Sequence, residues 1–378
     1  MALLFALTIF AAAALLFLLE PMTGKLLLPA FGGAPAVWNV CMAFFQAVLL
    51  AAYAYAHWLT RMASVRAQLA IHLVVVALPW LALPFAPRSA FAEDSGGDPT
   101  WSLLIVLSLT AGLPFFVVAT TSPLLGQWFA ASQHRHAADP YYLYAASNAG
   151  SILGLLAYPA LVEPRLALPG QTMGWTAGYV VLVCLIATCV VVLWRRHVGS
   201  ATRKRGTSGS LAHASGYQVE QQRDLSTLPV AARTREAETA KPSWPSKLLW
   251  LALAFVPSSL LLGVTAHLSS DVSPVPLIWV VPLALYLLSF VLVFSRLPAW
   301  VHRVFAVALP LLLLAQIYHL YTGHAGQHYS MQRLAALHLA TFFSAAMVCH
   351  GELARRRPAA ALLTQFYFWM ALGGVLGG

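Results

Sequence analysis

Residues 2–19 read ALLFALTIFAAAALLFLL, and Thr8 is the only polar side chain among them. A helix needs about 20 apolar residues to cross the hydrocarbon core of a bilayer, so this stretch is long enough to approach a full crossing. It lacks the basic start and the small-residue cleavage pattern of a secretory signal peptide. We therefore expect a first transmembrane helix that is retained in the mature protein.

Similar apolar runs recur along the whole chain. They lie near 36–56, 67–85, 101–120, 141–161, 173–194, 248–266, 275–294, 304–318 and 332–349. A final run opens at Phe366 and stops at Gly378, which corresponds to only about 20 Å of helix. The sequence thus predicts an all-α polytopic membrane protein with about ten full spans plus a truncated eleventh.

The composition agrees with a membrane location. Hydrophobic residues make up 60% of the chain and charged residues 9%, against roughly a quarter charged in an ordinary soluble domain. The net charge is +10, but the basic residues gather in short segments between apolar runs instead of covering one face. This distribution is typical of membrane topology signals, and it argues against nucleic-acid binding.

One segment differs from the rest. Residues 197–246 are rich in Ser, Thr, Ala, Gln, Arg and Glu and show no apolar periodicity, so we expect a flexible linker there. It separates a first membrane half, 1–196, from a second half, 247–378. Basic residues cluster after the even-numbered spans, namely Arg61, Arg66, Arg195, Arg196, Arg203, Lys204, Arg205, Arg296, Arg303, Arg355, Arg356 and Arg357. The positive-inside rule then places the N-terminus and the linker in the cytoplasm, on the inner side of the plasma (inner) membrane.

The two halves show weak internal similarity. Residues 141–144 (YYLY) and 366–369 (FYFW) both precede spaced glycines, and 35–38 (PAVW) resembles 276–279 (PLIW). Six spans, a basic linker and five further spans are the layout of a six-plus-six transporter without its twelfth span, in which parallel repeats are expected. The glycines Gly150, Gly154, Gly373 and Gly377 form small-xxx-small stripes, which favour close helix packing.

Three regions resemble a known family. They are residues 17–57 (FLLEPMTGKLLLPAFGGAPAVWNVCMAFFQAVLLAAYAYAH), residues 139–159 (DPYYLYAASNAGSILGLLAYP), and residues 271–294 together with 349–358 and 366–378. They are similar to the membrane region of the fused major-facilitator/spermidine-synthase-like family. The resemblance implies a major-facilitator-like helix bundle.

In that family a cytoplasmic domain similar to spermidine synthase follows the membrane part. The resemblance therefore implies such an aminopropyltransferase domain as a partner. This chain shows neither a glycine-rich nucleotide loop after a predicted strand nor an acidic pair suited to a polyamine. It also shows no nucleophile–base constellation. We expect no enzyme activity and no cofactor in residues 1–378.

Two charged residues near the end of the first span are candidates for a substrate path. Glu20 and Lys25 should lie near the outer boundary, where Pro21 is expected to break or kink the helix. They would either line the outward mouth of the path as a charge pair or form a structural ion pair at the interface. His267 and Asp271 occupy the corresponding place after span seven. A cavity containing Glu20 and Asp271 would suit a cationic solute such as a polyamine.

Other polar and aromatic residues give weaker signals. Gln46 and Asn148 lie inside spans, while Trp38 and Trp279 stand at the start of spans two and eight. Polar side chains at such depth either contact substrate or hydrogen-bond between helices. Near the cytoplasmic end of span ten, His350 and Glu352 would form a gate contact, a docking surface, or part of a basic membrane-surface patch.

Metal binding is not expected. The spacing of His319, His324 and His328 matches no standard metal site, and the four cysteines fall within apolar runs. Two function classes stay open: a transporter for a small cationic solute, whose halves rock about a midplane site, or a static anchor or sensor for a synthase-like domain. A transporter needs a water-accessible polar cavity between the halves, whereas an anchor does not.

Overall fold

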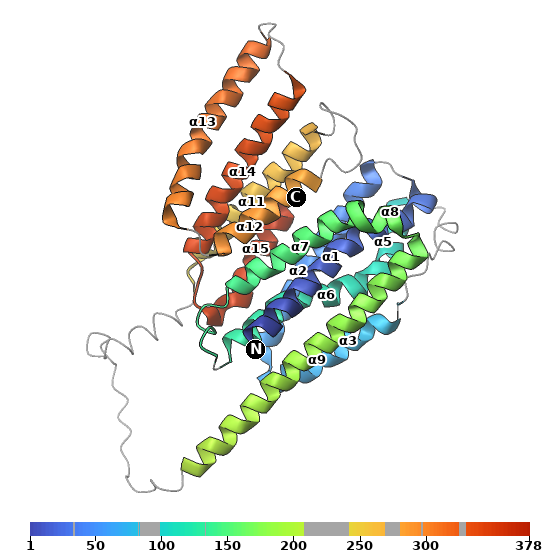
Figure 1. Ribbon diagram of the computed structural model, residues 1–378, viewed down its shortest axis with the longest axis vertical. Coiled ribbons are helices and arrows are strands. Elements are labelled where there is room, and N and C mark those ends of the chain that lie inside the picture. Colours follow the sequence, from blue (N-terminus) through green and yellow to red (C-terminus); the bar gives the residue numbers. More distant parts are fainter. Residues whose placement is uncertain are drawn as a thin grey trace, which may run out of the picture.

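The computed structural model describes residues 1–32, 35–81, 83, 99–132, 134–207, 242–268, 280–295, 298–324 and 330–378, and every regular element in these ranges is a helix. The helices form one bundle (Figure 1). Nine of the described helices are long and apolar enough to cross a membrane, and two shorter apolar helices cover Val65–Leu81 and Val280–Phe294. The predicted fold class, an all-α polytopic membrane protein, is confirmed.

The first half contains helices up to residue 207. They are α1 (Ala2–Phe31), α2 (Pro35–Met62), α3 (Val65–Ala77), η1 (Leu78–Leu81), α5 (Pro99–Leu107), η2 (Ser108–Gly112), α6 (Leu113–Ala130), α7 (Tyr142–Ala157), η3 (Tyr158–Val162), α8 (Glu163–Arg165) and α9 (Leu168–Thr207). The elements α5, η2 and α6 form one continuous span, as do α7, η3 and α8. In both spans a single turn of π-helix joins two α-helical parts.

The second half follows residue 242. Its helices are α11 (Trp244–His267), α12 (Val280–Phe294), α13 (Ala299–His324), α14 (Met331–Arg355), η6 (Ala360–Leu362) and α15 (Leu363–Gly377). We call the end of the bundle that carries Met1 the Met1 end. The opposite end, which α1 reaches at Phe31, is the Phe31 end.

Several helix ends differ from the predicted ones. Helix α1 continues through Pro21 to Phe31, because a membrane helix tolerates an internal proline, so Glu20 lies within the helix and not at its end. Helix α9 extends to Thr207, so part of the expected linker is helical; residues 208–241 lie outside the described ranges. The last candidate span begins at Ala360, before the predicted run, and covers 18 residues.

Glycines allow close helix contacts, as predicted. In α7, a Cβ on Gly150 or Gly154 would overlap the carbonyl oxygens of Phe10 and Ala14 in α1. In α15, Gly373 and Gly377 lie in the same way against the carbonyl oxygens of Leu251 and Phe255 in α11. The α1–α7 contact therefore recurs as α11–α15, with the same four-residue spacing on both partners.

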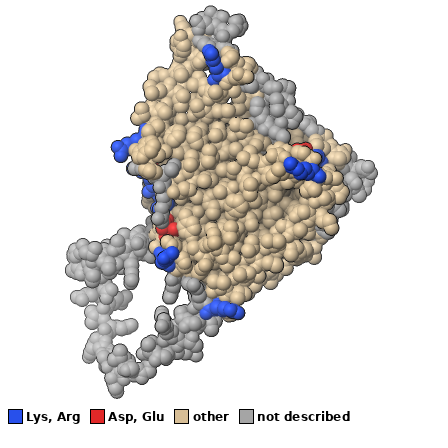
Figure 2. All heavy atoms as spheres, viewed as in Figure 1, with Lys and Arg blue, Asp and Glu red and all other residues tan. Residues whose placement is uncertain are grey.

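The two halves meet along a seam, which we define as the contacts of α7 with α12 and of α2 with α15. The largest buried apolar cluster lies within the first half and contains Phe5, Phe115 and Trp128. A second cluster crosses the seam, since it joins Tyr141 and Ala145 of the first half to residues of α11, α12, α14 and α15. Charged side chains lie at the edges of the face in Figure 2, whose centre is free of them.

Candidate functional site

A small polar cavity crosses the seam at the Met1 end. Its volume is about 60 Å³, and it is lined by His57, Thr60, Arg61, Gln127, Ala361, Leu362, Thr364 and Gln365. The Oγ1 of Thr364 in α15 lies 3.3 Å from Nδ1 of His57 and 3.2 Å from Oγ1 of Thr60, both in α2. The side-chain oxygens of Gln127 and Gln365 are buried without a hydrogen-bond partner in the described part of the chain. The cavity therefore presents free acceptors to water or a small polar solute.

A second set of contacts joins the halves beside this cavity; we call it the latch. Nη2 of Arg357 donates to Oδ2 of Asp139 at 3.0 Å, and the guanidinium lies 5.1 Å from the ring centroid of Tyr141. The Tyr141 hydroxyl donates to the carbonyl oxygen of Pro358 at 2.7 Å. Burial raises the pKa of the Tyr141 phenol above its usual range, so the hydroxyl keeps the proton that it donates.

Aromatic rings fill the seam beyond the latch. Tyr144 of α7 meets Phe290 and Phe294 of α12 edge-on, with ring centroids 5.3 and 4.9 Å apart, and its ring lies 5.0 Å from Tyr367 of α15. Edge-to-face pairs at this distance are favourable beyond their buried area. In this structure the halves are thus packed together at the Met1 end.

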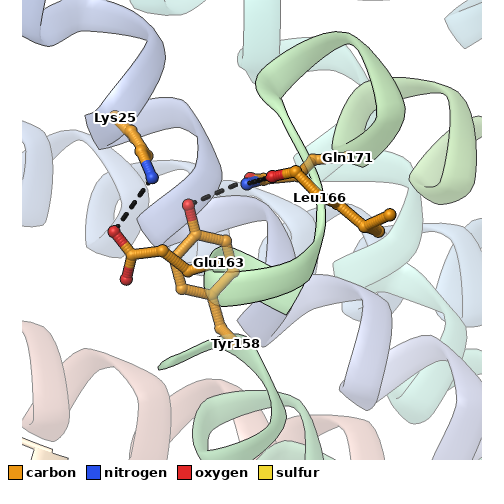
Figure 3. Close-up of polar contacts among 5 residues, drawn as sticks. All are labelled: Lys25, Tyr158, Glu163, Leu166 and Gln171. Carbon is orange, nitrogen blue, oxygen red and sulfur yellow. Dashed lines mark hydrogen bonds and ion pairs between the residues drawn. The ribbon is translucent and has the colours of Figure 1, made fainter. Parts of the chain in front are cut away.

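Lys25, which was predicted to share a charge site with Glu20, pairs with a different residue at the Phe31 end. Nζ of Lys25 lies 3.0 Å from Oε1 of Glu163 in α8, and both side chains are about one third exposed (Figure 3). Next to this pair, the Tyr158 hydroxyl donates to Oε1 of Gln171 at 3.1 Å. The Gln171 amide in turn donates to the Leu166 carbonyl oxygen at 2.8 Å. These contacts tie α1, α8 and the start of α9 together.

Glu20 makes no ion pair or hydrogen bond with any residue that the structure describes. Its position in α1 is nevertheless informative. Phe17, one turn earlier, packs against the cluster of Leu155, Val280 and Leu287, which bridges α7 and α12. Because residues three apart share a helix face, we expect Glu20 to lie on the side of α1 from which Phe17 reaches this cluster.

The remaining substrate-path candidates are spread over several contacts. Trp38 covers Gly24, and Nε2 of Gln46 lies against Gly378. Asn148 donates to the Tyr144 carbonyl oxygen of its own helix at 2.8 Å, so this donor is used within α7. His267 lies beside His338, with ring centroids 4.5 Å apart. Asp271 and Trp279 lie outside the described residues.

The two candidates at the end of span ten, His350 and Glu352, lie in different environments. His350 is fully buried and is turned toward Ser289 of α12, and its role as a gate or docking contact stays a prediction. Glu352 is three-quarters buried and pairs with Arg355 and Arg356. Sequence reasoning did not single out Glu163, Gln127 or Gln365, and it gave no role to Asp139, although that residue opens the region 139–159.

Among the comparisons with known proteins, only solved structures give matches. No family model matches the chain, and no curated protein matches it. Among solved structures, the MFS (major facilitator superfamily) proton:xylose symporter XylE bound to 6-bromo-6-deoxy-D-glucose aligns with 100% of this chain and 86% of its own chain. The identity is 13% and the TM-score 0.49. The resemblance to the fused spermidine-synthase-like family stays a prediction.

Proposed function

We propose that this chain is a transporter of the major-facilitator type that carries a small organic cation, such as a polyamine, across the inner membrane. The halves 1–196 and 247–378 rock against each other along the seam, with the Met1 end in the cytoplasm. The observation that carries this proposal is the carboxyl group of Glu20 within α1, which has no ion pair or hydrogen bond among the described residues and lies one turn from Phe17.

An ionisable side chain within a membrane helix is costly unless it is paired or reaches a water-filled cavity. Lys25 already has Glu163 as its counter-ion, and no other lysine or arginine in the described part of the chain pairs with Glu20. A carboxylate in this position lacks a compensating positive charge. A cationic solute that enters between the halves from the Phe31 end would supply that charge.

The Met1 end supplies the closed gate that such a cycle needs. The latch and the aromatic rings of the seam hold α7 and α15 together there. The polar cavity beside them gives the solute a hydrated exit path once these contacts break. Alternating access would consist of breaking the latch while the Phe31 end closes around Glu20.

Uptake by the purified chain in proteoliposomes tests the proposal, with radiolabelled putrescine, spermidine and a neutral sugar as probes. The wild type should take up an amine, and Glu20→Gln should lower that uptake at least about tenfold, whereas Glu20→Asp should retain part of it. The matched control is the double variant Lys25→Met/Glu163→Gln, which removes a charge pair of zero net charge. Full amine uptake by Glu20→Gln, or no amine uptake by the wild type, would overturn the proposal.

The second candidate is a static anchor or sensor for a spermidine-synthase-like domain. The tight aromatic packing of the seam and the small size of its cavity favour this alternative. A spin-label pair at Ala131 of the first half and Ser295 of the second separates the two. An anchor keeps one narrow distance distribution under all conditions, while a transporter shows a second distance when an amine is added.

A further inference from the structure

His350 is a buried histidine inside a membrane helix. The side chain is fully buried between α14 and α12. Its Nδ1 lies 2.7 Å from Oγ of Ser289, and the same Oγ lies 2.6 Å from the carbonyl oxygen of Tyr286. Together these two contacts indicate which atoms carry the protons.

A carbonyl oxygen only accepts hydrogen bonds, so the single hydroxyl proton of Ser289 points at Tyr286. The Ser289 oxygen must then accept from His350, which places the ring proton on Nδ1. The other nitrogen, Nε2, carries a lone pair, and it is buried without a hydrogen-bond partner in the described part of the chain. Most buried polar atoms have a hydrogen-bond partner. A buried ring nitrogen that has none is therefore a candidate site for binding a proton.

The surroundings connect this nitrogen to the seam. The ring of His350 stacks on Phe290 with centroids 3.6 Å apart and planes tilted by 19°. An imidazolium over an aromatic face is stabilised by the ring quadrupole. Phe290 in turn meets Tyr144 of the first half edge-on. Only one aromatic ring therefore separates His350 from the opposite half.

Few other titratable groups lie near His350. The neighbours are Tyr286 of α12, whose ring centroid is 5.0 Å away, His302 of α13, which lies against Gly351, and Cys349 and Glu352 of α14 itself. Residues 248–264 of α11 contain no titratable side chain. Glu352 is engaged by Arg355 and Arg356, so it is not a free counter-ion for a charge on the ring, and no other carboxylate contacts His350 in the described part of the chain.

We propose that Nε2 of His350 is a proton-binding site, and that proton uptake there opens the seam between α7 and α12. A proton from the aqueous phase binds to Nε2, while Nδ1–H keeps its bond to Ser289. The resulting imidazolium is buried without a counter-ion, which is costly. Separation of Tyr144 from Phe290 lets water reach the ring, so the charged form favours the open seam.

Distance measurements on spin labels at Ala131 and Ser295, in a variant whose four cysteines are replaced by alanine, test this inference. The cysteine-free background should shift toward longer distances as the pH falls from 7 to 4. His350→Gln should keep the short distance throughout. Ser289→Ala should move the midpoint of the transition without abolishing it, because the Nδ1–H tautomer loses its acceptor.

The control is His72→Gln, which changes another buried histidine that lies in α3, away from the seam. It should respond to pH as the background does, and thermal unfolding should show that both histidine variants are folded. A pH response that persists in His350→Gln, or no response in the background, overturns the proposal. The inference rests on the seam movement of the proposed function, but its readout needs no solute. Failed amine uptake with an intact pH response would overturn the proposed amine transport and leave the proton-binding site of His350 supported.

Discussion

At the scale of single residues, one interhelical hydrogen bond in the first half gives a clear prediction. The indole nitrogen of Trp128 in α6 donates to Oε1 of Gln68 in α3 at 2.9 Å, and both side chains are buried. Trp128→Phe leaves this oxygen without a donor, so we expect a loss of about 1 kcal/mol of unfolding free energy. Unfolding in mixed micelles measures it. Trp101→Phe, at a 69% exposed position, should be neutral; an equal loss there would contradict the hydrogen-bond explanation.

Residue partners were the hardest feature to predict from sequence. Glu20 and Lys25 are close along the chain, which suggested a shared charge site. Residues five apart in a continuous helix do not face each other, however, and α1 does not break at Pro21. Lys25 instead meets Glu163, which comes from the opposite end of the first half of the sequence. Only the fold brings such distant residues together.

At the scale of helices, the duplicated glycine contacts predict the outcome of two neighbouring substitutions in α15. Gly373→Ala forces a methyl group against the Leu251 carbonyl oxygen, so α11 and α15 must move apart. We expect a cost of about 1–3 kcal/mol in unfolding free energy. Gly374→Ala meets nothing within 4 Å and should be neutral or stabilising by up to about 1 kcal/mol, from helix propensity. Equal effects in the same unfolding assay would show that the packing does not depend on this contact.

The existence of the spans was predictable, whereas their ends were not. Apolar runs mark the part of a helix that lies in lipid, and each run expected from sequence coincides at least in part with a described helix. Hydropathy does not report where the backbone stops being helical. Helix α9 therefore continues to Thr207 in polar sequence, and the last span begins at Ala360, before its apolar run.

At the scale of the whole molecule, the seam carries the proposed function, and its composition was only partly visible in the sequence. The aromatic starts of spans five and eleven were noticed as a repeat, and the rings of Tyr144 and Tyr367 do meet across the seam. The polar groups beside them come from α2, α6 and α15. No periodicity links such groups, because each helix contributes only a few of them.

The latch gives a prediction about the balance between closed and open arrangements. The Asp139–Arg357 pair is about one third exposed, so it should contribute at most about 1 kcal/mol, which is a several-fold change in the ratio of the two populations. Asp139→Asn should therefore enlarge the long-distance population of the Ala131–Ser295 label pair. Raising the salt concentration to about 1 M should do the same in the wild type through screening.

In Asp139→Asn the added salt should have little further effect, because the screened interaction is already gone. Tyr141→Phe removes the bond to Pro358 but keeps the ion pair, so it should open the seam and still respond to salt. If Asp139→Asn kept the wild-type salt response, other charges would be holding the Met1 end closed.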